Sequence, residues 1–455
     1  MPEIRSFRAL RFDPDVVGDL GPIVAPPYDV IGPELHQKLL ARHPRNAVRL
    51  DLPIAEPGED PDERYRRVAR TFATWRSDGT LRKDPRPSVY VYEQTYRVPG
   101  TVLERTQRGF FARLRLEPFG ADGGVLPHER TLSGPKEDRY RLLRATGVNT
   151  SPVVGMFEDP AREASAIMTE IAATPPAVNV TDDDGVRHRL WAVPEASLPT
   201  DDDEGAGSAD VRSNDVDAAA RLIRIAAAGP VYIADGHHRY ETALRYRDER
   251  RMTRSCEPNP AFDYLLMLFL DTADNLTVLP THRVVRGLGD TGLARLAASL
   301  GRLFTVEPTD RSRLVARFEA AGELTGGDGR LGLVTRNGAW TLAAKRAAFE
   351  GLLAAGGSAV GALDVSLLSA TLDSLLGIDA AAVVGGERIR YSKSASEAVA
   401  LVDRHVDESD AAFLLEPTPV ASILAVAREG DVMPQKSTYF YPKALTGLVL
   451  NPHEW

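Results

Sequence analysis

One junction constrains the fold of this chain more than any other feature, the run VYIADGHHRYETAL at 231–244. Residues 230–236 have the pattern of a buried strand that stops at Asp235-Gly236, and a helical pattern follows at once over 237–251. Strands that alternate with helices are typical of α/β proteins. The sequence therefore predicts a mixed fold, α/β or α+β, in which this turn joins a sheet to a helix.

The same turn has the chemistry of an anion site. A helix N-terminus exposes unpaired N–H groups and the positive end of the helix dipole. Gly236 would let a phosphate approach the backbone, and Arg239 suits a bidentate phosphate contact. His237 and His238 add ring donors in the same helical turn. The alternative is structural: Asp235 only caps the helix, and the histidines bond to local carbonyls.

A second charged motif is VLPHERTLSGPKEDRY at 125–140. His128 could contact a substrate, Glu129 could act as a general base or a metal ligand, and Lys136 could contact a phosphate. The same run could instead be a solvated loop and helix start with ordinary surface charges. The pattern leaves both interpretations open.

The third motif is MPQKSTYFYPK at 433–443. Lys436, Ser437 and Thr438 are residue types that contact phosphates, although the Gly-x-x-x-x-Gly-Lys frame of a P-loop is absent. Tyr439 could stack on a nucleotide base. An edge strand with aromatic packing is the alternative.

Two shorter motifs supply further candidates for substrate binding. His282 and Arg283 lie in LPTHRVV at 279–285, where a satisfied buried histidine is the simpler interpretation. Asp29 lies in PIVAPPYDVIGP, whose prolines favour a rigid, extended segment. It could be catalytic, or it could anchor a turn.

Composition excludes several classes of function. The chain has 455 residues, 43% of them hydrophobic, and a net charge of −9, so we expect a soluble globular protein that does not bind nucleic acid through a global electrostatic surface. The single cysteine, Cys256, cannot form an intramolecular disulfide. The longest weakly charged apolar stretch, 411–427, is interrupted by a glutamate and two prolines. We therefore expect no membrane span and a cytoplasmic protein.

The histidines include no His-Glu-x-x-His or His-x-x-x-His spacing, so we expect no protein-bound metal site. Magnesium carried by a nucleotide needs only one or two carboxylates and leaves no spacing signature. Locally, the patterns predict a helix over 60–79, a strand over 47–53 and a hairpin from 88–98 and 105–119.

Taken together, the motifs resemble the domain-of-unknown-function 1015 family. The resemblance rests on APPYDVI, HERT with GPKEDRY, NTSP, ADGHHRYETAL, LPTHRVV and MPQKSTYFYPKALTGLV, and runs from about Arg5 to Asn451. The combination is specific, whereas each motif alone would be weak.

The ADGHHR turn also resembles the phosphate-binding turn of the ParB and sulfiredoxin-like superfamily. His237 stands where sulfiredoxins have their catalytic cysteine, which argues against reductase chemistry. The turn is more similar to that of the free serine kinases, and this likeness implies phosphate handling by Asp235, His237, His238 and Arg239. We align no residue with the kinases' catalytic glutamate, so Glu129 is a candidate on its chemistry alone.

These likenesses imply a ParB-like core with an insertion and a second domain. The expected ranges are 1–85 for the N-terminal part of the core, 86–198 for an inserted β-rich region, 199–214 for an acidic loop, 215–290 for the core with the turn, 291–400 for a second α/β domain and 401–455 for a C-terminal segment.

The leading hypothesis is a phosphotransferase that uses ATP or ADP with Mg and acts on a small hydroxylated metabolite, with free serine as one candidate. The alternatives are a nucleotide-binding switch of ParB type without turnover and a phosphate-ester hydrolase. The expected partners are a nucleotide and a small molecule, and a homodimer is one assembly that the chain could form.

Overall fold

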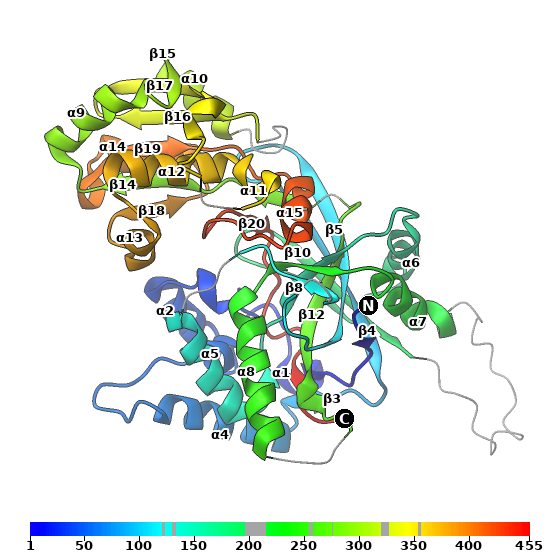
Figure 1. Cartoon of the computed structure of the whole chain (residues 1–455). Coiled ribbons are helices and arrows are strands. Elements are labelled where there is room, and N and C mark those ends of the chain that lie inside the picture. The colour runs from blue at the N-terminus through cyan, green and yellow to red at the C-terminus, as the bar shows by residue number, and fades with distance from the viewer. Residues whose placement is uncertain are drawn as a thin grey trace, which may run out of the picture.

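The computed structural model describes residues 1–120, 123–129, 133–195, 215–253, 258–274, 276–319, 327–353 and 356–455. The acidic loop expected at 199–214 and Cys256 lie outside these ranges. The described residues form the mixed α/β fold that the sequence predicts, with two large sheets in two lobes (Figure 1). None of the helices within them is long and apolar enough to cross a membrane.

The larger sheet mixes parallel and antiparallel pairs. Among the described residues its strands follow the spatial order β6 (Val125–Leu126), β11 (Val231–Asp235), β8 (Val153–Phe157), β12 (Tyr264–Asp271), β5 (Glu104–Arg115), β4 (Ser88–Arg97), β10 (Arg187–Pro194) and β9 (Val178–Thr181), with β1 (Ile4–Arg5) beside β5. β11 runs parallel to β6 and antiparallel to β8. The antiparallel pair of β4 and β5 confirms the predicted hairpin. Strands from 86–198 and from 215–290 therefore alternate within one sheet.

Both faces of this sheet are covered. Along β12, Leu266 and Leu268 join one apolar cluster, while Leu265, Met267 and Phe269 join another. This is why the strand reads as a continuous apolar run. Helix α5 (Ser133–Thr146) contacts α4 (Glu63–Ser77) and α8 (His237–Thr253), and α6 (Glu163–Ala172) packs with α7 (Asp215–Ala226) (Figure 1).

Two helical segments test the local predictions near the N-terminus. The helix expected over 60–79 is confirmed as α4, which buries Tyr65, Val68, Phe72 and Trp75 in the core. The strand expected over 47–53 is wrong, because Val48–Asp51 forms the short helix α3. Its start is fixed by a side chain, since the Val48 N–H donates to Asn46 Oδ1 at 2.9 Å.

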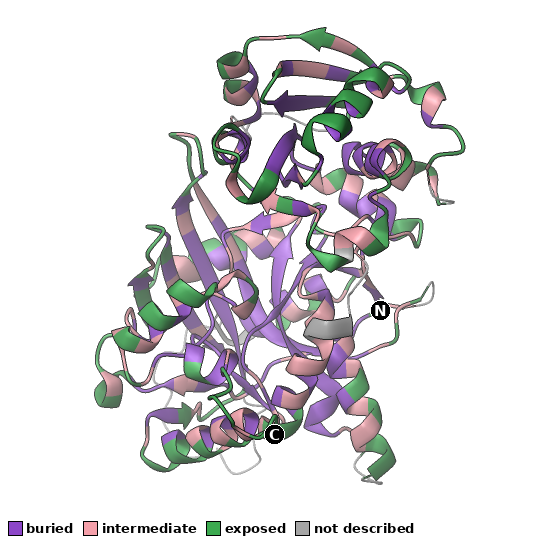
Figure 2. Cartoon of the chain, turned by 90° about the vertical axis from the view of Figure 1, so that its left-hand side faces the viewer, coloured by how far each residue is buried: buried purple, intermediate pink, exposed green. Residues whose placement is uncertain are grey.

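The second sheet is antiparallel throughout. Its strands among the described residues follow the order β15 (Phe304–Pro308), β17 (Gly338–Ala344), β16 (Arg330–Thr335), β19 (Ser409–Leu414), β14 (His282–Arg286) and β18 (Ile389–Ser392). Nearby helices include α9 (Gly289–Leu300), α10 (Arg311–Glu319), α11 (Ser358–Gly361), α12 (Asp364–Leu376), α13 (Ala380–Gly385), α14 (Ala395–Asp403) and α15 (Val420–Arg428). The strands of both sheets are mostly buried, and exposed positions gather on the outer helices and loops (Figure 2).

The C-terminal segment returns to the first lobe. β20 (Tyr439–Tyr441) pairs with β13 (Thr277–Leu279), and β21 (Asn451–Pro452) pairs with β7 (Val148–Asn149). Arg113 is 1% exposed and donates to Asn451 Oδ1 at 2.6 Å and to the backbone oxygens of Pro452 and Glu454 at 2.6 and 2.9 Å. Asn451 and Pro452 are therefore part of the core of the first lobe.

The remaining elements are short or peripheral. They are β2 (Leu10–Phe12), α1 (Pro14–Val17), α2 (Pro33–Arg42) and β3 (Leu81–Lys83), with 3₁₀ turns at Tyr28–Val30, Ala261–Asp263, Arg346–Phe349 and Val406–Glu408.

Candidate functional site

The three charged motifs converge around the imidazole of His128. The backbone N–H of His128 donates to His237 Nε2 at 3.2 Å, and the ring atom His128 Nε2 lies 3.1 Å from Thr438 Oγ1. His128 Nδ1 lies 2.5 Å from the Ile233 carbonyl oxygen, and the Met433 N–H donates to the His128 carbonyl at 2.8 Å. Residues from 125–140, 231–244 and 433–443 therefore form one site, as expected for motifs that share a function.

The hydrogen bonds fix the tautomers of the two central histidines. A carbonyl oxygen only accepts, so His128 carries its proton on Nδ1 and accepts from the Thr438 hydroxyl at Nε2. His237 accepts at Nε2 from a backbone N–H, so that nitrogen is unprotonated. Burial lowers the pKa of His128 to about 4 and that of His237 well below its ordinary value. Both rings are therefore neutral near pH 7 and hold the three motifs in place.

Asp235 is the last residue of β11 and forms ion pairs with two cationic side chains. Its carboxylate accepts from Lys443 Nζ at 2.8 Å and from Arg239 Nη2 at 2.7 Å, and these three side chains are only 19%, 11% and 11% exposed. Although burial opposes its ionisation, Lys443 and then Arg239 hold the pKa of Asp235 far below the ordinary value. Asp235 is therefore a permanent anion with both oxygens occupied.

The turn after Asp235 is covered by the side chain of its own helix. Gly236 has φ +90°, and a Cβ there would lie 2.9 Å from Arg239 Nε. The Arg239 guanidinium also donates to the Pro152 carbonyl, and its Nε has no partner among the described residues. An anion that reaches the backbone of this turn must displace Arg239 or bind against it.

Tyr28, from the PPYDVI motif, lies between two arginines. Its ring centroid is 4.1 Å from the Arg139 guanidinium and 6.0 Å from that of Arg239. Arg139 is buried and donates to the Asp51 backbone oxygen and to Asp138, each at 2.5 Å. This arrangement fixes the N-terminal segment against α5 and α8.

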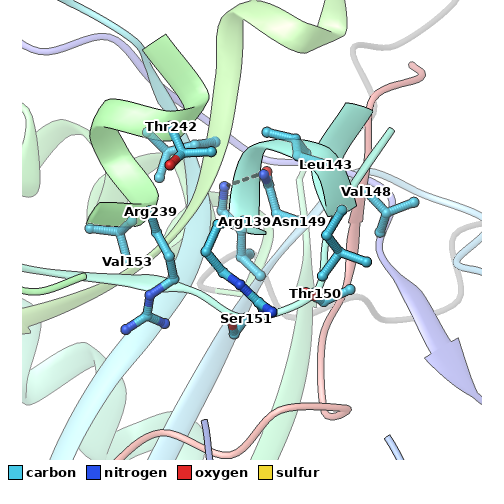
Figure 3. Close-up of a pocket in the computed structure, with 12 residues that line it drawn as sticks. Arg139, Leu143, Val148, Asn149, Thr150, Ser151, Val153, Arg239 and Thr242 are labelled. Carbon is cyan, nitrogen blue, oxygen red and sulfur yellow. Dashed lines mark hydrogen bonds between the residues drawn. The ribbon is translucent and has the colours of Figure 1, made fainter. Parts of the chain in front are cut away.

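A small cavity lies between these arginines (Figure 3). Its volume of about 40 Å³ is enough for water and too small for a metabolite. Its lining includes Arg139, Asn149, Thr150, Ser151, Arg239 and Thr242.

Lysines gather around Tyr439. Lys393 Nζ lies 3.6 Å and Lys443 Nζ 4.4 Å from the centre of the Tyr439 ring. Desolvation, followed by repulsion from Lys443 and Lys436, lowers the pKa of Lys393 to about 8. Cations on this ring compete with a stacked base, so the stacking role of Tyr439 stays a prediction. The ammonium groups of Lys393 and Lys436 are suited to an anionic ligand.

Glu129 lies beside this positive region. Burial raises the pKa of its carboxyl to about 7, and the attraction of Lys436 limits the rise. Lys436 is exposed and has φ +56°, a left-handed conformation that is uncommon for lysine. Asp29 is also exposed, and its charge acts on Lys393, so this carboxylate faces the same region.

The other candidate residues from these motifs interact with neighbouring side chains or backbone groups in the fold. Lys136 Nζ donates to Glu241 at 2.5 Å, an ion pair between α5 and α8. Burial, then the charges of Lys436 and Lys136, lowers the pKa of His238. Ser437 is buried, and its hydroxyl donates to a backbone carbonyl of its own loop. The Ser437 hydroxyl is therefore committed to shaping the loop.

The LPTHRVV motif enters the second sheet as β14. His282 is fully buried, and its Nδ1 accepts from the Leu415 N–H at 3.1 Å, the contact of a structural histidine. Arg283 is also buried, and it is close enough to Glu129 for the two charges to affect each other.

Sequence reasoning missed four residues of this region: Lys393, Lys443, Tyr28 and Arg139. Lys443 and Tyr28 lie inside motifs that were singled out, but only the fold gives them partners. Lys393 follows β18 in the other lobe, and no local pattern distinguishes it. Within the part of the chain that the structure describes, no group of three or more histidine, cysteine, aspartate or glutamate side chains could hold a metal ion.

The chain is similar to a known protein family. The model of the family described as "Protein of unknown function (DUF1015)" matches residues 4–366. No curated protein matches the chain.

Similar solved structures include a conserved hypothetical protein from Pyrococcus furiosus, with 13% identity, a TM-score of 0.33 and coverage of 73% of this chain and 90% of that one. A free serine kinase in complex with AMP has 13% identity, a TM-score of 0.35 and coverage of 73% and 86%. SbnI with a C-terminal truncation, from Staphylococcus aureus, has 10% identity, a TM-score of 0.34 and coverage of 74% and 87%.

Proposed function

The chain belongs to the family described as "Protein of unknown function (DUF1015)", and from the geometry of its site we propose that it is a nucleotide-dependent phosphotransferase. The acceptor would be a small hydroxylated metabolite, with free serine as one candidate, and the donor would be ATP or ADP. We further propose that the strand, turn and helix at 231–253 belong to a ParB and sulfiredoxin-like core.

One observation supports this proposal above the others, the placement of a carboxyl group with a pKa of about 7, Glu129, where the charges of Lys436 and Lys443 act on it. Phosphoryl transfer needs positive charge on the phosphates and a base for the attacking hydroxyl. Asp235 is unsuited to be that base because two cations already occupy its oxygens. Glu129 is therefore the proposed base.

In the proposed reaction, ionised Glu129 accepts the proton of the acceptor hydroxyl. The acceptor oxygen then forms a bond to the terminal phosphorus, and the bond from that phosphorus to the bridging oxygen of the nucleotide breaks. The bridging oxygen keeps the electron pair and leaves as a nucleotide with one phosphate fewer. Lys436, Lys393 and His238 lie where they could stabilise the charge on the phosphates.

Magnesium would arrive with the nucleotide, and it needs only one or two protein carboxylates. Asp29 is an exposed carboxylate whose charge acts on Lys393, so it fits that role. When bound, the ion would neutralise phosphate charge. Its proposed ligand is distinct from the base, which leaves Glu129 free for the proton.

The test is direct. Purified protein is incubated with ATP or ADP and with serine or related alcohols, and ³¹P NMR follows the phosphate. We expect a phosphate monoester of the acceptor, and the variant Glu129→Gln should lower kcat by about 10²- to 10⁴-fold. Nucleotide binding without transfer would contradict the proposal in favour of a switch. Release of phosphate from phosphoserine without nucleotide would indicate a hydrolase.

The pH profile gives a second readout. Glu129 must be ionised, so kcat/KM should rise with pH up to about 7. Lys393 must be protonated to attract phosphate, so kcat/KM should fall above about 8. The variant Lys393→Met should lose the fall at high pH and keep the rise. A profile that is flat from pH ~5 to pH ~9 would contradict both assignments.

A further inference from the structure

A second cavity, of about 310 Å³, lies in the other lobe. This volume is at the lower end of the range for small-molecule pockets. Its walls come mainly from α12, α13, β14, β18 and the loop at 431–435. The described residues that line it do not include Glu129, which pairs through its backbone with Met433 of that loop. A molecule in this cavity is therefore not the acceptor of the proposed transfer.

Arg283 is the buried cation of the cavity lining. It is 2% exposed, and its Nη1 donates to the Thr281 carbonyl at 2.9 Å. Its Nη2 is buried and has no partner among the described residues, and its guanidinium carbon lies 5.7 Å from the centre of the Tyr391 ring. Buried N–H groups of a guanidinium are almost always paired, and an unpaired one is costly. An anionic group of a ligand would remove this cost.

A second polar group of the lining is also left without a partner. The Ser366 hydroxyl, on α12, is buried and has no hydrogen-bond partner in the part of the chain that the structure describes. Ser369, one turn further along α12, instead donates to the Val365 carbonyl at 2.9 Å, as helical serines often do. The cavity is thus lined by a guanidinium and a hydroxyl that can each donate to an oxygen of a ligand.

Most of the remaining wall is apolar. Aliphatic side chains come from α12, α13 and β18, and they are joined by a methionine of the 431–435 loop. A ligand gains free energy here in proportion to the apolar area that it buries, so it needs an apolar body besides its oxygen acceptor. The apolar residues of this wall are Val360, Leu372, Ile378, Val383, Ile389 and Met433.

Three aspartates of the lining restrict the charge of the ligand. Asp373 and Asp379 are exposed and Asp431 is half-buried, so water and salt screen their charges more than that of buried Arg283. Two of the three, Asp379 and Asp431, also accept from backbone N–H groups. One guanidinium among three carboxylates disfavours a phosphate ester or another polyanion. A single carboxylate can pair with Arg283 and bring no second negative charge to the aspartates.

We propose that this cavity binds a monocarboxylate with an apolar body, such as a medium-chain fatty acid. The carboxylate would accept from Nη2 of Arg283, and the chain would lie along the apolar wall. An α-amino acid is a poor ligand, because its ammonium group would be held close to the Arg283 guanidinium. Such binding is independent of the phosphate transfer proposed above.

Octanoate is the probe, and calorimetry with the full chain measures its binding. Octanol has the same chain without the charge, and the α-amino acid of the same chain length adds an ammonium group beside the carboxylate, so each should bind about tenfold more weakly. Hexanoate is two methylene groups shorter and should also bind about tenfold more weakly. No binding of octanoate, or octanol that binds as tightly as octanoate, would overturn the proposal.

The variant Arg283→Met tests the buried cation. It should weaken octanoate by about tenfold and leave octanol unchanged, because methionine keeps the apolar stem and loses the charge. A disturbed fold would weaken both ligands, so the selective loss identifies the ion pair. Unchanged octanoate affinity, or an equal loss for both ligands in a variant with the urea midpoint of the parent chain, would refute the assignment of Arg283.

Two serines of α12 locate the ligand even where Arg283→Met does not fold. Each hydroxyl donates to the carbonyl four residues earlier, at 2.9 Å for Ser369 and 2.7 Å for Ser374, but only Ser369 is among the described residues of the lining, and Ser374 is exposed. Ser369→Leu fills part of the cavity and should weaken octanoate and octanol by about tenfold, whereas the matched control Ser374→Leu should change neither. Equal octanoate affinities in these two variants would place the ligand outside the cavity and overturn the proposal.

Discussion

Replacement of Glu129 by glutamine should stabilise the protein while it removes activity. Burial raises the pKa of this carboxyl from 4.5 to about 7, which corresponds to a penalty of about 3 kcal/mol on its charged form. Between these two pKa values the folded protein holds a proton that the unfolded chain has lost, so stability falls as the pH rises. Glutamine has nearly the same shape and no charge to desolvate, so the variant avoids this loss.

The gain in the free energy of unfolding of the Glu129→Gln variant depends on pH, so it can be tested at more than one pH. At pH ~5 the folded protein is still protonated at Glu129 and the variant should gain little, whereas its advantage should grow by about 2 kcal/mol by pH ~8. Urea unfolding of both proteins across this range measures the difference. The control Glu307→Gln, on the exposed strand β15, should show no such trend. Parallel stability curves for Glu129→Gln and the parent chain would refute the reasoning.

Four further substitutions test the geometry of the turn and its neighbours. Asp235→Asn leaves two largely buried cations without their carboxylate and should cost about 3–5 kcal/mol in urea unfolding, whereas Lys443→Met should cost less because Arg239 still neutralises Asp235. Gly236→Ala should cost about 1–3 kcal/mol in the same assay and weaken nucleotide binding, because φ is +90° and the new Cβ meets Arg239. Tyr28→Leu should lower the free energy of unfolding by about 1 kcal/mol through its lost arginine contacts, and an unchanged urea midpoint would contradict that role.

Features encoded by neighbouring residues could be predicted from the sequence. The strand that ends at Asp235 and the helix that begins at His237 are confirmed, because an apolar run followed by Asp-Gly and a polar helical pattern specifies both elements locally. The hairpin of β4 and β5 is confirmed for the same reason, since its alternation extends over long strands. The three motifs could also be singled out, and the structure brings them together.

The partners within the site could not be predicted. Asp235 and Lys443 are 208 positions apart, and their ion pair exists only because β20 returns to the first lobe. Lys393 meets Tyr439 across the two lobes. The raised pKa of Glu129 likewise depends on burial by distant segments, so residue type alone could not distinguish it from Asp29 as a base.

Short periodic patterns were the other weak point. The segment at 47–53 alternates apolar and polar residues, yet four residues of it form a helix. Tertiary contacts decide this case, because buried Asp51 accepts from the hydroxyl of Thr150 at 2.6 Å and from the buried Arg139 guanidinium at 3.4 Å. A period read over so few residues does not distinguish a strand from a turn of helix.

The return of residues 443–455 to the first lobe has a consequence for biosynthesis. Arg113 emerges from the ribosome more than three hundred residues before Asn451, its buried partner. Until then, the guanidinium and the edge of β7 lack the contacts that bury them. The first lobe therefore cannot be completed until residues 443–455 have been made, which happens only after the whole of the second lobe has been made.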